Sequence, residues 1–174
     1  MRFPSRTVLS TILATAFVCI AAAPATAQLS RLASGFGAYV GQNQVNKLFA
    51  FSAHEHANGD VHGHCIVMEP SSNGYVRMQV TSSATLNGTL YLAGPITHAV
   101  HSPPFFAVGA TGLFGVTDNG GWGWGWGSPP DEFVGLSAAP LVLGNLTAAQ
   151  ILGMIGAPPP AAFQPLLFGN IRIF

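Results

Sequence analysis

The clearest alternation of apolar and polar positions lies in residues 47–68, on both sides of the dipeptide Asn58-Gly59. A period of two is typical of a β-strand with one buried face, and Asn-Gly between two such segments is typical of a hairpin turn. The pattern therefore predicts a β-hairpin with one apolar and one polar face. The apolar positions are Phe49, Phe51, Ala53, Val61, Gly63, Cys65 and Val67, and the polar positions are Ser52, His54, His56, His62 and His64.

The register of this hairpin depends on the length of its loop. A two-residue loop mixes apolar and polar side chains on both faces of the ribbon. A three-residue loop separates them and places Gly59 where the backbone is left-handed. Because a slip of one residue turns every side chain to the other face, we predict the three-residue loop. His54 then lies directly opposite His62, and His56 and His64 occupy flanking positions.

Shorter segments of the same alternation follow along the chain, with turn residues between them. They predict an all-β fold with a single domain, either an antiparallel sandwich or a partly open barrel. We expect further strands at 75–82, 89–93, 105–108, 112–117, 133–136 and 170–174, with a loop at 98–104.

One segment, 146–155, has the loose periodicity of a short helix. Either Asn145 or Thr147 supplies an N-cap, and Gly156 followed by Pro158 ends the helix. Few of its residues are polar, so we expect this helix to pack on a sheet edge.

Residues 1–27 have the pattern of a secretory signal peptide, with a basic start, an apolar run and a small-residue cleavage site. We therefore expect a secreted protein, periplasmic or extracellular, and no later apolar run is long enough for a transmembrane segment. Residues 28–46 are mixed and contain glycine, and we expect partial disorder there apart from a short strand at 38–40. The β-domain is then expected to span 47–174.

Loss of this signal peptide leaves four basic and six acidic residues, a net charge of −2 with neutral histidines. No basic patch remains, which argues against nucleic acid as a partner. Cys65 has no second cysteine to pair with, so we expect a buried thiol on the core face. Only 7% of the residues are charged and 49% are hydrophobic, a composition that favours association and a structural extracellular role.

The histidine face is the first candidate site. Neutral imidazole is a common ligand of zinc and copper, and His-x-His on adjacent strands directs ring nitrogens to one side of a sheet. His54, His56, His62 and His64 are the predicted metal ligands, and His98 and His101 could join them from a later loop. The alternative is that surface strands tolerate histidine and no ion is bound.

A tryptophan row is the second candidate site. Trp122, Trp124 and Trp126 alternate with glycine, so in an extended chain their indoles project from one face. Such a row is suited to stacking on a glycan or lying on a surface. The alternative is a glycine-rich loop whose tryptophans fold back over the domain.

Motifs of the common enzyme classes do not occur in the sequence. There is no nucleophile elbow, no phosphate-binding glycine loop and no zinc-protease helix, since His54-Glu55-His56 lies on a strand. The acidic residues are too few and scattered to nominate a glycosidase pair. Asp118-Asn119 and Asp131-Glu132 suit calcium, but turn formation explains them more simply. We therefore expect a non-enzymatic protein.

Several strand and turn motifs occur together along the chain: Phe49-x-Phe51-Ser52-Ala53, Gly59-x-Val61-x-Gly63, Val116-x-Asp118-Asn119-Gly120, Pro129-Pro130-Asp131 and Pro165-Leu166-x-x-Gly169-Asn170-Ile171. In this combination the chain resembles a group of small secreted bacterial all-β proteins, over most of 47–174. The resemblance implies an exported single β-domain and supplies no catalytic residues. The chain departs from that pattern in its histidine-loaded hairpin and in the glycine-tryptophan run.

Overall fold

The computed structural model describes residues 30–120, 129–139, 145–156, 158 and 162–174. The predicted signal peptide and the row of Trp122, Trp124 and Trp126 lie outside these residues. Across the described ranges, no helix is both long and apolar enough to cross a lipid bilayer.

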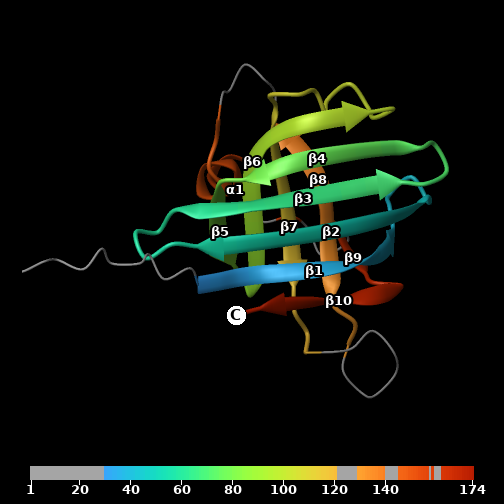
Figure 1. Cartoon of the computed structure of the whole chain (residues 1–174). Helices are drawn as coiled ribbons and strands as arrows, with labels where there is room; N and C mark the ends of the chain where they lie inside the picture. The colour runs from blue at the N-terminus through green and yellow to red at the C-terminus, as the bar shows by residue number, and fades with distance from the viewer. Residues whose placement is uncertain (1–29, 121–128, 140–144, 157, 159–161) are drawn as a thin grey trace, which may run out of the picture.

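The strands are β1 (Ser30–Val40), β2 (Asn46–Glu55), β3 (Val61–Glu69), β4 (Gly74–Val80), β5 (Ser82–Leu86), β6 (Thr89–Val100), β7 (Thr111–Thr117), β8 (Glu132–Ala139), β9 (Phe163–Pro165) and β10 (Phe168–Ile173), and the helix is α1 (Ala148–Ile155). The strands form one curled antiparallel sheet in the order β10-β1-β2-β3-β4-β6-β7-β8-β9, with β5 paired to β6. The sheet makes a half-barrel (Figure 1), so the predicted all-β class is confirmed.

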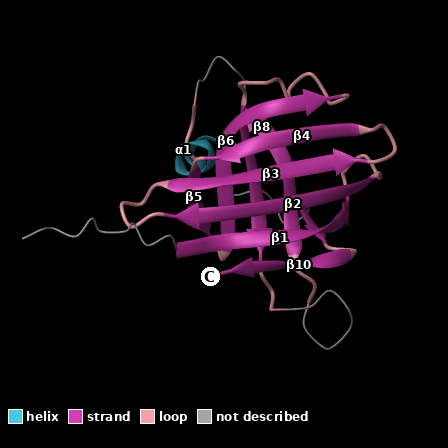
Figure 2. Ribbon diagram, viewed as in Figure 1, coloured by secondary structure: helices cyan, strands magenta, loops and turns pink. Residues whose placement is uncertain are grey.

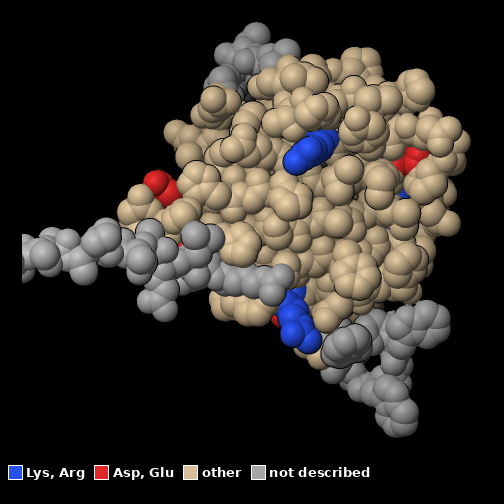
Figure 3. Space-filling view, in the orientation of Figure 1, with Lys and Arg blue, Asp and Glu red and all other residues tan. Residues whose placement is uncertain are grey.

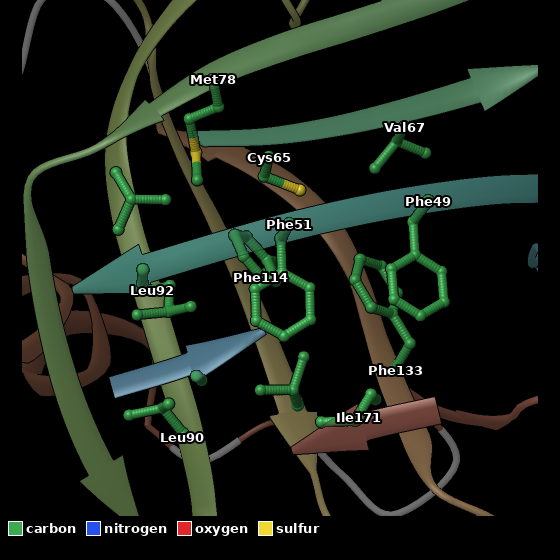
Figure 4. Close-up of a cluster of buried hydrophobic side chains, with 14 of the residues drawn as sticks. Phe49, Phe51, Cys65, Val67, Met78, Leu90, Leu92, Phe114, Phe133 and Ile171 are labelled. Atoms are coloured by element: carbon green, nitrogen blue, oxygen red, sulfur yellow. The ribbon is translucent and has the colours of Figure 1, made fainter. Parts of the chain in front are cut away.

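The curled sheet presents two layers. Strands β1 to β4 and β10 run across the front, together with the end of β6 that pairs with β4, and the first part of β6 crosses behind them with β7 and β8 at a steep angle (Figure 2). Aromatic rings from both layers meet between them: Phe49 lies 4.4 Å from Phe133, and Phe51 lies 5.4 Å from Phe114, between ring centroids. The apolar face predicted for the hairpin is therefore one wall of the core (Figure 4).

The expectation of disorder in 28–46 is wrong for Ser30–Val40, which forms β1 and pairs with both β2 and β10. Glycine lowers the strand propensity of this segment, and for that reason the sequence did not predict the full strand. The glycines are required by packing, because a Cβ added at Gly35 would lie 2.7 Å from Cε1 of Phe51. The β-domain therefore begins before residue 47.

Two further expectations are corrected between β6 and β7. The strand predicted at 89–93 continues to Val100, and it changes neighbours on the way, pairing first with β5 and then with β4. The predicted strand at 105–108 is a loop, in which Phe105 and Phe106 pack against each other with ring centroids 4.5 Å apart. Two prolines before this segment and Gly109 after it keep it out of the ladder.

The helix α1 is confirmed and begins after Thr147. The Thr147 hydroxyl accepts a hydrogen bond from the Gln150 backbone N–H, and the Gln150 side chain accepts one from the Thr147 N–H, which makes a capping box. The buried side chains Ile151 and Leu152 pack with Tyr91 of β6. The helix thus covers the back of β5 and β6.

A segment near the C-terminus joins the two ends of the sheet order. Strand β9 pairs with β8, while β10, only two residues later, pairs with β1. Between them, the Leu166 N–H donates to the Asp131 carbonyl at 2.9 Å and the Leu167 N–H donates to the Ala38 carbonyl at 2.8 Å. This arrangement fits the partly open barrel predicted from the sequence.

Candidate histidine site on the β2–β3 hairpin

The structure gives the hairpin the predicted register. His54 pairs with His62 and Ser52 with His64, so these side chains share one face of the ribbon. The Gly59 N–H donates to the His56 carbonyl at 2.8 Å, and Gly59 has a φ of +87°. The three-residue loop is therefore confirmed, with glycine in the left-handed position.

Side-chain hydrogen bonds fix the tip of the hairpin. Asn58 Nδ2 donates to Asp60 Oδ2 at 2.7 Å, and the Asp60 N–H donates back to Asn58 Oδ1 at 3.1 Å. The His56 N–H donates to the Asp60 carbonyl at 2.8 Å, which continues the ladder up to the loop. The strand ends that carry the histidines are thus held in a defined register, at the left of Figure 1.

Two of the four histidines contact each other through their rings. The ring centroids of His56 and His62 lie 4.9 Å apart, with an angle of 86° between the ring planes. The two residues are diagonal neighbours across β2 and β3, and His64 has the same diagonal relation to His54. His62 is exposed and His56 is half-buried, so the pair lies at the surface of the hairpin.

The structure brings all four predicted ligands to one face without assembling them into a ready group. Among the described residues, no three side chains of His, Cys, Asp or Glu are grouped so that they could hold a metal ion. His98 lies elsewhere, on β6 opposite Arg77, where its Nδ1 is 3.2 Å from Thr97 Oγ1. His101 follows the end of β6 and does not join the hairpin.

Cys65 lies on the opposite side of the same hairpin. Its side chain is 1% exposed and belongs to the core cluster, as the strand alternation predicts. Burial raises the pKa of the Cys65 thiol far above its usual range. The thiol is therefore kept protonated and apart from the histidines, which excludes it as a ligand on their face.

The acidic turn residues considered for calcium are engaged within the fold. Asp131 is 1% exposed, and its carboxylate accepts hydrogen bonds from the N–H groups of Asn119 and Ile171 at 2.9 and 2.8 Å. Asp118 accepts from the N–H groups of Gly120 and Ile173 at 2.8 and 3.1 Å. Asp118, Gly120 and residues 170–174 also line a shallow hollow of about 240 Å³.

Sequence reasoning missed one surface. The strand face that carries the histidines also carries apolar residues further along β2 and β3, among them Leu48, Ala50 and Ile66. The signal was present in the sequence, since these even-numbered positions are apolar as well as the core positions. Figure 3 shows this side of the molecule, on which charged side chains are sparse.

Comparisons of the chain with family models, curated proteins and solved structures gave no match. The resemblance to small secreted bacterial β-proteins stays a prediction. The tryptophan row, as the alternative site, falls outside the described residues. A functional assignment therefore rests on the geometry of the hairpin and its face.

Proposed function

We propose that this protein is an exported, non-enzymatic binding protein that takes a transition-metal ion, zinc or copper, on the histidine face of the β2–β3 hairpin. The observation that carries the proposal is the ring contact of His56 with His62, with centroids 4.9 Å apart. His54 lies directly opposite His62, so its imidazole is a third one next to this pair. Imidazole nitrogen is a preferred ligand of both metals.

The spacing of the His56–His62 pair suits shared coordination of one ion. Zinc binds imidazole nitrogen at about 2.0–2.1 Å with tetrahedral angles, so two coordinated nitrogens lie roughly 3.3 Å apart. Rings whose centroids are 4.9 Å apart reach that separation by rotation about their side-chain bonds. The hydrogen-bonded tip holds the two backbones in register, which lowers the ordering cost of binding.

Two tetrahedral positions remain, and they belong to one imidazole of His54 or His64, the next diagonal pair along the hairpin, and to water. His64 is exposed and His54 half-buried, so neither is locked into the core. A site of this kind has open positions and lies on the surface, which suits the capture of an ion better than its burial as a structural element.

Titration calorimetry of the signal-free chain with zinc and with copper tests the proposal. The informative variant is His62→Ala, and the matched control is His98→Ala, because His98 lies on the same sheet away from the hairpin. We expect stoichiometric binding that weakens at least about tenfold in His62→Ala, the effect of losing one ligand, and is unchanged in His98→Ala. Absence of binding, or equal weakening in both variants, overturns the assignment.

A further inference from the structure

The outer surface of β1 to β4 is arranged in rows, because paired residues on neighbouring strands share a face. Three such rows form the surface that we call the outer face. They are Phe36–Ala50–Ile66–Arg77, Ala38–Leu48–Met68–Tyr75 and Ser34–Ser52–His64–Gln79. Two of the three rows are therefore mainly apolar, and the third is polar.

The outer face leaves apolar side chains in solvent. Phe36 is 60% exposed and Met68 is 37% exposed, and Leu48, Ala50 and Ile66 are half-buried. A solvated face of an antiparallel sheet normally alternates to polar residues. A contiguous apolar patch on a sheet indicates a surface that is covered in the working state of the protein.

We propose that a second copy of this chain covers the outer face, in a symmetric dimer whose two-fold axis runs parallel to the strands between β2 and β3. Such an axis reverses the strand order of the partner, so that β1 lies over the partner's β4 and β2 lies over the partner's β3. Each row then faces the same row of the partner, read in the opposite direction.

In this arrangement each row of one copy is complementary to the same row of the other copy. Small faces large at the centre of the face, since Ala50 lies against the partner's Ile66, whereas Ala38 is 3% exposed and is already covered within its own chain. Such alternation lets the side chains of two stacked sheets interdigitate. In the third row Ser52 faces the partner's His64, so polar groups also meet polar groups.

The charges on the outer face also favour a second copy of the chain as its partner. Arg77 is the one charged residue among the three rows, β10 adds Arg172 beside Ser34, and the rows contain no acidic residue. The reversed order sets the Arg77 guanidinium on the ring of the partner's Phe36, where a cation is attracted to the aromatic face. Two cations on strands at opposite sides of the face, Arg77 on β4 and Arg172 on β10, are a poor match for an anionic membrane, which attracts clusters of basic residues.

The outer face is large enough for a dimer when the flanking strands β10 and β6 are included. Six neighbouring strands span about 29 Å and eight residues of strand span about 27 Å, so the footprint is roughly 780 Å². A standard interface buries about 800 Å² on each partner.

Sedimentation velocity of the signal-free chain over a wide range of concentration tests the dimer. EDTA is present to remove metal ions, so the result does not depend on the proposed metal site. We expect a monomer–dimer equilibrium whose dissociation constant rises about a hundredfold in Ile66→Lys. The control Val108→Lys, at a 59% exposed position in the loop after β6, leaves the constant unchanged. Circular dichroism verifies folding, and Met68→Lys repeats the test at an exposed position.

A double-mutant cycle tests the position of the axis. Phe36 and Arg77 lie on β1 and β4, which β2 and β3 separate, so coupling between them arises across the interface. Phe36→Ala and Arg77→Gln each weaken the dimer by about tenfold, and the double variant weakens it little further. A monomer at all concentrations, a dimer indifferent to Ile66→Lys and Met68→Lys, or additive effects in the cycle each overturn the proposal.

Discussion

The carboxylate of Asp131 accepts a hydrogen bond from the backbone N–H of Ile171, with 2.8 Å between donor and acceptor. The same carboxylate accepts from the Asn119 N–H at 2.9 Å, so it joins the turn after β7 to β10. Asp131 is 1% exposed and immediately precedes β8. A buried carboxylate held by backbone amides thus ties the C-terminal strand to the wall of the half-barrel.

Replacement of the Asp131 carboxylate should weaken the attachment of β10 to the rest of the sheet. In Asp131→Asn the amide NH₂ takes the place of one acceptor oxygen and leaves a buried backbone N–H without its partner. We expect a loss of about 2 kcal/mol in the free energy of unfolding, measured by urea denaturation. Asp60→Asn at the exposed hairpin tip should change it by less than about 0.5 kcal/mol. Equal stability of the two variants would contradict this role for Asp131.

Cys65 should make stability depend on pH in the alkaline range. Burial raises the pKa of its thiol in the folded state, whereas an unfolded thiol ionises above about pH 8.5. The unfolded chain then binds fewer protons than the folded chain, so stability falls as pH rises, by about 1.4 kcal/mol per pH unit.

The effect of Cys65 is best measured from about pH 8.5 to 10. Burial also raises the pKa of Tyr39, but this tyrosine ionises in the unfolded chain only from about pH 10, so it affects stability above that window. Urea denaturation across that window should show the slope in the wild type and a flatter dependence in Cys65→Ala. The same slope in both proteins would assign it to another group.

Metal affinity should fall as the solution is acidified, because protons compete with the ion for imidazole nitrogen. If His56 and His62 both bind, the logarithm of the affinity approaches a slope of two against pH in acid, and His62→Ala lowers that slope by one. Calorimetry in two buffers of different ionisation enthalpy counts the released protons. A slope unaffected by His62→Ala would show that this side chain is not a ligand.

Zinc should strengthen the proposed dimer. The axis between β2 and β3 sets His54 over the partner's His62, and stacked sheets lie about 10 Å apart, so an ion held by His56 and His62 of one chain can take His54 of the partner as a further ligand. Sedimentation with zinc in place of EDTA should give a tighter dimer. The double variant His54→Ala with His62→Ala should lose this gain and keep the dimer seen in EDTA. A dissociation constant indifferent to zinc, with zinc bound, would show that the partner supplies no ligand.

Gly35 should tolerate no side chain, since an added Cβ would lie 2.7 Å from Cε1 of Phe51 and 2.9 Å from the Asn170 carbonyl oxygen. We expect Gly35→Ala to lower the unfolding free energy by about 1–3 kcal/mol through overpacking. The matched control is Gly135→Ala in β8, where an added Cβ meets no atom within 4 Å. Thermal or urea denaturation compares the two, and a stable Gly35→Ala would mean that β1 can shift freely against β2.

The sequence determined the features that depend on neighbours along the chain. Alternation around Asn58-Gly59 specified the hairpin, its loop and the pairing of His54 with His62, because a slip would bury the histidines. Thr147 and Gln150 likewise specified the start of α1 through a local capping box. These interactions span few residues, so residue type and spacing suffice to predict them.

The tertiary structure decided the features that depend on distant partners. The glycines of β1 weaken it as an isolated strand, and their small size becomes an advantage only where the rings of Phe49 and Phe51 and the backbone of β10 approach them. In the sequence Asp131 has the character of a turn residue. Only the structure shows its hydrogen bond with Ile171, forty positions away, which attaches β10 to the start of β8. The rows of the outer face exist only through strand pairing, because register between strands sets which side chains become neighbours.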